Sequence, residues 1–204
     1  MVSSFGDIFH SPGCRSIEMQ SRSHIHNESH LLEMLNDPKQ RDAAFGAFYD
    51  AYSRQVYTYA LRMTACVSDA CDVTQETFIR VHAHLLRGNT ISDPLPFCLM
   101  IARQRVLNMR RDHKETVEID EDHLVADPYP EIFSADIAQH LERVISDLPL
   151  LMRDAFLLRY YDGLSYEKIA EMISESSGTV RMRVQRAKTL LRRKLAHLVS
   201  EVRR

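Results

Sequence analysis

Apolar residues recur at steps of three and four along several stretches of the chain, the spacing that gives an α-helix one buried side. The first stretch begins at Asp42 and predicts a helix with these inner residues: Phe45, Phe48, Tyr49, Tyr52, Val56, Ala60 and Leu61. A second helix is expected after Ser68, a good N-cap with acidic residues in or near its first turn. It would bury Ala70, Val73, Thr77, Phe78, Val81 and Leu85 before Gly88 ends it. The proline-containing segment from Gly88 to Pro96 predicts a loop, and a third helix follows over about 95–112.

Helical spacing resumes at Ile137 and predicts four further helices, at 137–148, 154–161, 166–173 and from about 179 onward. Between Arg111 and this second series the periodicity stops over roughly 20 residues, which is long for a loop within one compact domain. The sequence shows no convincing strand alternation, so we expect an all-α protein: two small helical domains joined by an acidic flexible linker. The expected divisions are a poorly ordered extension (1–35), a first domain (36–113), the linker (114–134) and a second domain (135–204).

The formal net charge is only -2, yet the charges are segregated along the chain. Residues 99–113 carry a net +3, residues 114–147 a net -8, and residues 178–204 a net +8. A domain that grips nucleic acid through an overall positive field usually has a basic excess, so the total alone argues against one. The segregation instead indicates separate partner surfaces.

The segment from Asp162 to Arg193 has the layout of a helix-turn-helix. Ser165 suits the N-cap of its first helix, and Ser177 or Thr179 would start the second. At 100° per residue, Val184, Ala187 and Leu191 fall within about 40° of Val180 and would face the core. The opposite side presents Met182, Gln185, Arg186 and Thr189, flanked by Arg181, Arg183 and Lys188. Arginine can bond to guanine and glutamine to adenine in a DNA major groove; the alternative is a solvated basic helix of a bundle.

Three motifs carry a family resemblance. They are DACDVTQETFIRVH at 69–82, IARQRVLNMRRDH at 101–113, and a long segment at 141–195 that contains LPLLMRDAFLLRYYDGLSYEKIA and SSGTVRMRVQRAKTLLRR. In this order they resemble bacterial RNA polymerase sigma factors of the extracytoplasmic-function (ECF) group, over about residues 42–200. The resemblance implies a protein that binds core RNA polymerase, recognises the minus-35 and minus-10 promoter elements and assists DNA melting. A freestanding helix-turn-helix regulator with an amino-terminal sensor or dimerisation domain is the alternative.

The resemblance implies a docking surface for the clamp helices of the polymerase β′ subunit. It maps onto four residues of the second helix: Asp72, Gln75, Glu76 and Arg80. Helical geometry agrees, because these positions share a side of the helix opposite the apolar positions. An ordinary acidic face in contact with solvent is the alternative.

The resemblance also implies that the loop before the third helix, and that helix, hold nontemplate-strand bases of the minus-10 element. The matching residues are Asn89, Thr90, Ser92, Arg103, Gln104, Asn108, Arg110 and Arg111. Single-stranded DNA needs a positive groove with pockets for unstacked bases, and residues 99–113 are the basic block of the first half. The sequence departs from the usual pattern, with Pro94 and Leu95 replacing an aromatic residue and an arginine, and Phe97 replacing a tryptophan.

The last helix would read the minus-35 element. The residues so implied are Thr179, Arg181, Met182, Arg183, Gln185, Arg186 and Lys188, with Met182 in place of a small polar residue. In the group the linker threads toward the polymerase active site, whereas a flexible acidic spacer explains the same composition equally well. The implied partners are core RNA polymerase, through the β′ clamp helices and the β flap, promoter DNA and an anti-sigma factor.

Other chemistry is weakly indicated. His24, His26 and His30 lack matching cysteines or carboxylates, so we expect no metal and no cofactor. Cys66 and Cys71 could form a redox pair, but buried thiols are favoured. The phosphate-binding loop, HExxH and GxSxG motifs do not occur, so we expect no catalytic residue and no enzyme. Because the apolar stretches fall short of the ~20 residues that span a bilayer, we expect a cytoplasmic protein without membrane insertion.

Overall fold

Three long helices, α2 (Arg41–Thr64), α3 (Val67–Leu86) and α4 (Pro94–Thr116), pack around one apolar core and form a first unit. The computed structural model describes residues 29–116 and 135–202, and a short helix at 29–36 precedes α2. The inner side chains of the first unit are fully buried: Phe48, Val56, Met63, Val73, Val81, Leu85, Leu99 and Val106. Burying each such side chain contributes about 1.5–3 kcal/mol, so the apolar spacing determines which side of each helix faces inward.

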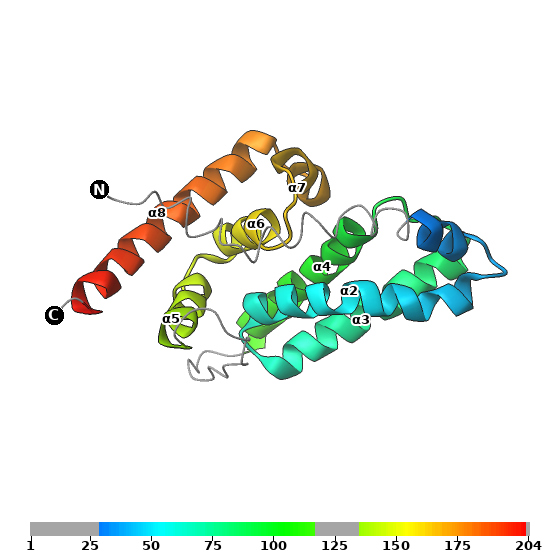
Figure 1. Cartoon of the computed structure of the whole chain (residues 1–204), viewed down its shortest axis with the longest axis horizontal. Coiled ribbons are helices and arrows are strands. Elements are labelled where there is room, and N and C mark those ends of the chain that lie inside the picture. Colours follow the sequence, from blue (N-terminus) through cyan, green and yellow to red (C-terminus); the bar gives the residue numbers. More distant parts are fainter. Residues whose placement is uncertain (1–28, 117–134, 203–204) are drawn as a thin grey trace.

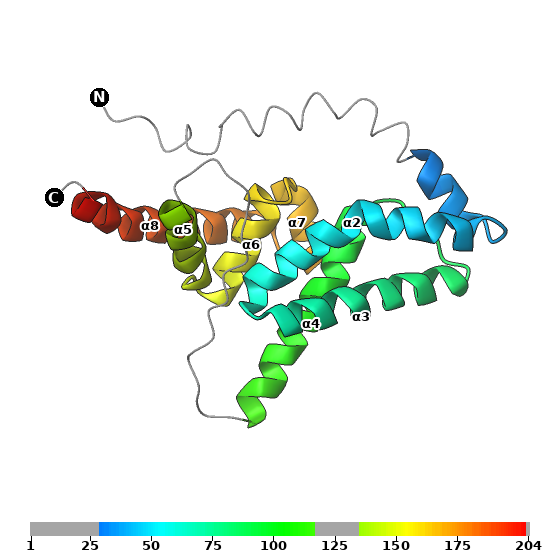
Figure 2. The ribbon, with the colours of Figure 1, turned by 60° about the horizontal axis from the view of Figure 1, so that its bottom comes forward.

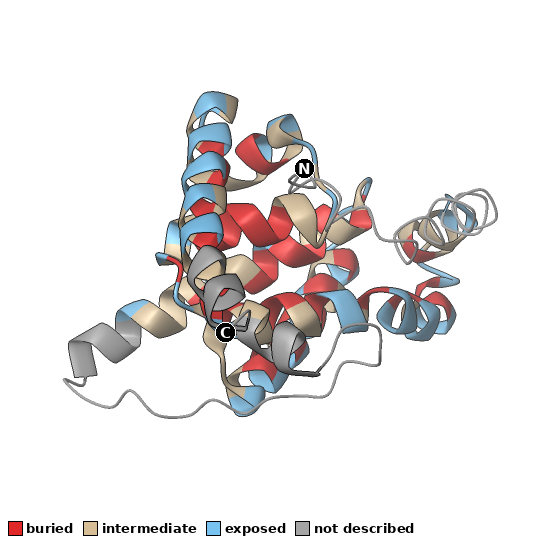
Figure 3. Cartoon of the chain, turned by 60° about the vertical axis from the view of Figure 1, so that its left-hand side comes forward, coloured by how far each residue is buried: buried red, intermediate tan, exposed pale blue. Residues whose placement is uncertain are grey.

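The other helices, α5 (Ala135–Ser146), α6 (Leu150–Tyr160), α7 (Tyr166–Ile173) and α8 (Ser177–Val202), form a second unit. Its core contains Ile145, Phe156, Leu158, Ile169, Val184 and Leu191. The two units lie side by side, with α5 and α6 against α2, and α7 against α4 (Figures 1 and 2). Buried residues gather where the helices meet (Figure 3). The fold is all-α, as predicted, and the described residues contain no strand.

The start of α3 differs from the prediction. Ala65 follows α2 in the left-handed conformation with a φ of 57°, and the extended Cys66 directly precedes the first helical residue, Val67. Cys66 is the N-cap and makes no side-chain cap hydrogen bond, so the expected cap at Ser68 is wrong. Because the chain reverses within two residues, Ser68 already lies inside the first turn.

Helical structure extends beyond its expected limits at two places. Residues 29–36 are helical although the extension was expected to reach residue 35, because Leu35 is fully buried and Asn36 bonds twice to Ile91. The Asn36 amide donates to the Ile91 carbonyl at 3.2 Å and accepts from the Ile91 N–H at 3.0 Å. At the other place, α4 continues to Thr116, past its expected end near 112, since lysine and glutamate have a high intrinsic helix propensity. The rest of the expected linker, 117–134, and residues 1–28 lie outside the described residues.

In the second unit, one helix has the predicted boundaries and another begins earlier than predicted. Helix α7 occupies the predicted residues. The glycines that were expected to end helices have left-handed conformations: Gly163 has a φ of 72° after α6, and Gly88 has a φ of 82° after α3. Helix α6 begins at Leu150, before the predicted start at 154, because the Pro149 carbonyl accepts from two backbone N–H groups of the next turn at 2.8 and 3.0 Å. The proline therefore starts α6 as well as ending the helical spacing of α5.

Candidate nucleic-acid interface

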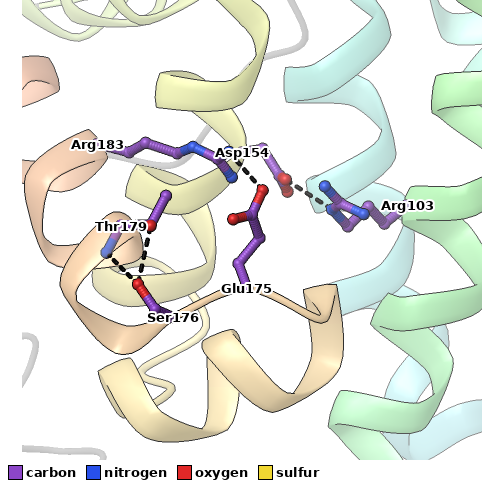
Figure 4. Close-up of polar contacts among 6 residues, drawn as sticks. All are labelled: Arg103, Asp154, Glu175, Ser176, Thr179 and Arg183. Atoms are coloured by element: carbon purple, nitrogen blue, oxygen red, sulfur yellow. Dashed lines mark hydrogen bonds and ion pairs between the residues drawn. The ribbon is translucent and has the colours of Figure 1, made fainter.

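Both helices of the helix-turn-helix begin at a serine that caps the first turn. Ser165 Oγ accepts from the Lys168 N–H at 3.0 Å at the start of α7, which confirms the predicted cap. Ser176 Oγ accepts from the Thr179 N–H at 3.0 Å and lies 2.9 Å from the Thr179 hydroxyl (Figure 4). Helix α8 therefore begins at Ser177, one of the two predicted starts.

Helix α8 presents to solvent the side that the sequence predicts. Val180, Val184 and Ala187 are fully buried, and Leu191 is almost so. The opposite side is exposed: Arg181, Met182, Gln185, Arg186 and Thr189. Two packed helices with a short turn and a long second helix whose outer side carries hydrogen-bonding side chains can place that side in a DNA major groove.

The basic side chains on α8 differ in how they are held. Arg183 Nη2 lies 2.7 Å from Glu175 Oε1 in the turn, and the Arg183 side chain is only 17% exposed (Figure 4). This arginine therefore braces the helix against the turn, whereas Arg186 extends into solvent. The flanking cations Arg181 and Lys188 lie 5.1 and 5.5 Å from the ring centroids of Tyr166 and Tyr160.

The predicted docking surface lies on the outer side of α3. Asp72, Gln75 and Arg80 are exposed and Glu76 is partly exposed, while Val73, Thr77 and Phe78 between them are buried. Arg80 Nε lies 2.6 Å from Glu76 Oε1, one helical turn away. We call these four residues the docking face. It combines two carboxylates, an amide and a guanidinium on one helix side.

An apolar groove of about 870 Å³ between α2 and α3 borders the docking face, and sequence reasoning missed it. Tyr49, Phe78, Ile79 and His82 line it, with Tyr49 43% and Ile79 56% exposed. The prediction that Tyr49 faces inward is wrong, because its neighbour Phe48 takes the inner position. Successive residues differ by 100° around a helix, a signal that could have separated the two.

The residues predicted to bind the minus-10 element fall into two groups. Asn89, Thr90 and Ser92 are exposed in the loop before α4, and Gln104 and Arg111 are exposed on α4, with Asn108 partly exposed. Arg103 and Arg110 instead contact protein groups. Arg103 Nε donates to Asp154 Oδ2 at 2.6 Å (Figure 4), and Arg110 Nη2 donates to the Met63 carbonyl at 2.7 Å. Burial lowers the pKa of the Arg110 guanidinium.

Two buried charged residues of α6, Arg153 and Asp154, were not singled out from the sequence. Asp154 is 1% exposed and accepts from the Tyr59 hydroxyl at 2.8 Å as well as from Arg103. Arg153 donates to the Met63 carbonyl at 3.1 Å, and burial together with Arg110 lowers its pKa to about 10. The signal was an adjacent arginine and aspartate inside the apolar run from Met152 to Leu158.

The candidate metal-binding and thiol residues are only partly covered by the described residues. No group of three metal-ligating side chains occurs in the part of the chain that the structure describes, and His24 and His26 lie outside it. Cys66 and Cys71 are free thiols. Cys66 is partly exposed and Cys71 is exposed on the outer side of α3, so the expectation that they are buried is wrong. Cys98 is fully buried, and burial raises its pKa to about 12.

Within the described ranges, none of the helices is both long and apolar enough to cross a membrane.

The sequence matches two domain families in the order of the two helical units. Residues 48–116 match the family described as Sigma-70 region 2, and residues 138–191 match Sigma-70, region 4. The chain is 30% identical over 188 residues to the RNA polymerase sigma-H factor of Pseudomonas aeruginosa, across 85% of this chain and 96% of that protein. It is 27% identical over 186 residues to the ECF RNA polymerase sigma factor SigW of Bacillus subtilis, across 84% of this chain and 100% of SigW.

A solved structure shares the fold. It is the sigma factor RpoE of Bartonella quintana in complex with the anti-sigma factor NepR, with a TM-score of 0.65 and 22% identity over 74% of this chain and 96% of that one. Region 2 and region 4 helices in this order are the architecture of sigma-70 type factors. The chain belongs to the ECF group of RNA polymerase sigma factors, which direct promoter-specific initiation of transcription.

Proposed function

We propose that the two units of this sigma factor have separate tasks, with residues 36–113 as the polymerase-docking and minus-10 domain and residues 135–204 as the minus-35 domain. Residues 114–134 are then the acidic connection between them, either threaded toward the polymerase active site or acting as a spacer. The observation that carries this proposal is the outer side of α8, where Gln185 and Arg186 are exposed over a fully buried stripe.

The minus-35 contacts are assigned to α8. Arg186 and Gln185 have the reach and hydrogen-bonding groups to contact base edges, while Arg181 and Lys188 neutralise phosphates. Met182 is 46% exposed and offers an apolar contact, which suits a thymine methyl group. Thr179 and Arg183 support the helix start, since both are bound within the turn.

The docking face on α3 is assigned to the β′ clamp helices of core polymerase. Its four polar residues adjoin the apolar groove lined by Tyr49 and Ile79, so polar and apolar contacts can form side by side. Interfaces of this kind take their energy from buried aromatic and aliphatic anchors and their specificity from the surrounding polar groups.

The minus-10 contacts are assigned to the loop before α4 and to α4 itself. Asn89, Thr90, Ser92 and Gln104 are accessible to an unstacked base, and Arg111 adds positive charge. Arg103 and Arg110 complete this surface once they leave their present partners, Asp154 and the Met63 carbonyl.

Further partners follow from the family. Sigma factor RpoE of Bartonella quintana is in complex with an anti-sigma factor, and we assign this chain a partner of the same kind, together with the β flap of polymerase for its second unit. We place its action in the cytoplasm, where core polymerase works, and we assign it no catalytic step and no cofactor.

Reconstituted transcription tests the proposal. Purified core polymerase, with and without the protein, transcribes fragmented genomic DNA of the source organism, and the new 5′ ends are sequenced. We expect start sites that appear only with the protein and share two upstream elements. If the protein shifts DNA by itself but starts no transcript with core polymerase, it is a freestanding regulator instead and the assignment fails.

A further inference from the structure

An asparagine outside the three long helices of the first unit holds the loop that is assigned to the minus-10 element. Asn36 ends the short helix at 29–36, which lies beside the loop between α3 and α4 (Figures 1 and 2). Its side-chain amide donates to the Ile91 carbonyl at 3.2 Å, and its side-chain oxygen accepts from the Ile91 N–H at 3.0 Å. One side chain therefore binds both backbone groups of a loop residue that lies 55 positions further along the chain.

The loop is fixed at its two ends and in its middle. Gly88, with a φ of 82°, ends α3, and Pro94 begins α4. In the middle, the Ile91 side chain is 3% exposed and packs into the apolar core. Apolar burial has no preferred direction, whereas hydrogen bonds do, so burial fixes the position of Ile91 and the two bonds from Asn36 fix the orientation of its backbone.

The side chains assigned to the minus-10 element project from this fixed backbone. Asn89, Thr90 and Ser92 are exposed, and the last two flank Ile91 directly. The depth and orientation of Ile91 therefore determine where the two hydroxyl groups lie. Asn89 is held separately, because its side-chain amide donates to the His84 carbonyl at 3.3 Å. An unstacked base is recognised by hydrogen bonds to its edge, which require donors and acceptors at defined positions.

Asn36 is itself held by its neighbours. Leu35 is fully buried, and its carbonyl accepts from Arg41 Nε at 3.1 Å. Arg41 is a buried arginine, with 6% exposure. On the other side, the Asp37 carboxylate accepts from the side-chain amide of Gln40 at 2.9 Å. A residue that orients a binding site has to be fixed by its own surroundings, and Asn36 meets this condition.

The anchor affects DNA binding through the order of the loop. A loop that is already ordered loses little further conformational entropy when a base binds, whereas a loop that moves loses it on binding. Without Asn36, both backbone groups of Ile91 would lose their partner, and the loop would adopt other conformations in which water satisfies them. Affinity for the base would fall although every group that contacts DNA is still present.

We propose that Asn36 is a positioning residue for minus-10 recognition, which holds Ile91 so that Thr90 and Ser92 meet one unstacked base in a preformed site. The inference rests on the proposed function of this loop. The anchor joins two segments of the first unit, so it acts without any contact from the second unit. Asn36 acts through the loop and does not itself contact DNA.

Two full-length variants remove the anchor in different ways. Asn36→Ala removes both hydrogen bonds, and Asn36→Asp keeps the volume but replaces the donor by an oxygen that faces the Ile91 carbonyl. Gln40→Ala is the matched control, because it removes an exposed amide and one hydrogen bond, to Asp37, without touching the loop. Far-UV circular dichroism establishes that each variant is folded, and if Asn36→Ala does not fold, Asn36→Asp decides the outcome.

The first measurement is the affinity of holoenzyme for a single-stranded oligonucleotide. It carries the nontemplate minus-10 sequence of a promoter that the wild-type holoenzyme transcribes, and in further versions each base in turn is replaced by an abasic site. We expect both Asn36 variants to bind the intact strand about 5- to 20-fold more weakly, and Gln40→Ala to bind it as the wild type does. One abasic position should weaken the wild type and leave Asn36→Ala almost unchanged, because that variant has already lost the site for this base.

A second measurement separates positioning from general stabilisation of the fold. Thr90→Ala with Ser92→Ala removes the two hydroxyl groups, and this loop variant is also combined with Asn36→Ala. If Asn36 acts through the loop, the combined variant binds the strand only slightly more weakly than the loop variant alone. If the two losses multiply, Asn36 acts independently of the loop and the inference is wrong.

Unchanged affinity of the folded Asn36 variants for the intact strand also overturns the inference. So does an equal loss of affinity for the minus-35 duplex, since that result marks a general defect of the protein. Failure of the proposed function gives a different result: the loop variant, with Asn36 intact, then binds the minus-10 strand as tightly as the wild type. A loop variant that binds weakly beside Asn36 variants that bind normally contradicts the role of Asn36 alone.

Discussion

In the proposed minus-35 surface, Arg186 is the side chain that we expect to contribute most to recognition. It is exposed on the outer side of α8, beside Gln185, while the helix is fixed from behind by its buried stripe. Arginine at such a position can make two hydrogen bonds to one guanine, a geometry that no shorter side chain reproduces.

Replacing Arg186 by alanine should weaken binding to the minus-35 duplex by about 1–3 kcal/mol, because the base contact is lost while the helix remains. Fluorescence anisotropy of holoenzyme on cognate and scrambled minus-35 duplexes measures the change. Arg143→Ala, which removes an exposed arginine from α5, is the control and should leave the affinity unchanged. A loss of equal size on both duplexes would show that Arg186 contacts phosphate alone.

The buried carboxyl of Asp162 makes the stability of the protein depend on pH. Its Oδ2 is buried and makes no hydrogen bond among the described residues, and burial raises the pKa of the carboxyl to about 7. Arg62 lowers the pKa and Asp154 raises it, both by their charge. Because the folded protein holds this proton more tightly than the unfolded chain, the stability from Asp162 is complete below about pH 4 and falls as the pH rises to about 7.

Asp162→Asn should therefore match the wild type at pH 4 and exceed its free energy of unfolding at pH 8, by on the order of 2 kcal/mol. Urea unfolding followed by circular dichroism at both pH values measures the difference. Asp50→Asn, an exposed carboxylate of α2, should show no such pH dependence. A variant that gains no stability at pH 8 would place the carboxyl in contact with water.

At the scale of single helices, the sequence predicts interiors better than ends. The buried stripe of α8 and the limits of α7 follow from spacing and from the Ser165 cap, because both depend on neighbours within a few residues. The start of α3 could not be predicted in this way. It is determined by the left-handed conformation of Ala65, which no pattern of side chains indicates. The helix at 29–36 depends on the burial of Leu35 by distant residues, which local composition does not reveal.

The proposed docking role of α3 can be tested on the whole helix, because the four residues of the docking face lie on one side of it. Gln75→Ala combined with Glu76→Ala should weaken binding to core polymerase by about 1–2 kcal/mol, since interface truncations of this kind lose contacts and leave partner groups unpaired. Competition between the variant and wild-type protein for core polymerase measures the loss.

The control for the α3 variant is Glu33→Ala with Asp50→Ala, which removes two exposed carboxylates from the first unit outside α3. Affinity for the minus-35 duplex should be the same in all three proteins. If the α3 double variant competes for core polymerase as well as the wild-type protein does, the docking site lies on another helix.

At the scale of the whole molecule, a net charge of -2 conceals a strongly basic segment at the carboxy-terminal end of the sequence. The last 27 residues carry +8, and much of that charge lies along α8. What the sequence could not show is how the units meet. Arg153 and Asp154 are two charges in an apolar run, and their partners Tyr59, Met63 and Arg103 come from remote parts of the chain.

The concentrated charge predicts a steep salt dependence. Arg193 is exposed on α8 two turns beyond Arg186, so in the proposed minus-35 complex we expect it to contact a phosphate and not a base. Arg193→Ala should reduce the slope of log affinity against log salt by about 0.9, the value for one phosphate contact. It should weaken cognate and scrambled minus-35 duplexes equally, in contrast to Arg186→Ala; an unchanged slope would mean that Arg193 touches no phosphate.

The order along the chain of Asp154 and its two partners, Tyr59 and Arg103, affects how the protein emerges from the ribosome. Asp154 is synthesised 51 residues after Arg103 and 95 after Tyr59. At 5–20 residues per second, roughly 3–10 seconds pass between Arg103 and its partner. Each nascent chain therefore goes through a period in which Arg103 has no carboxylate to hold it.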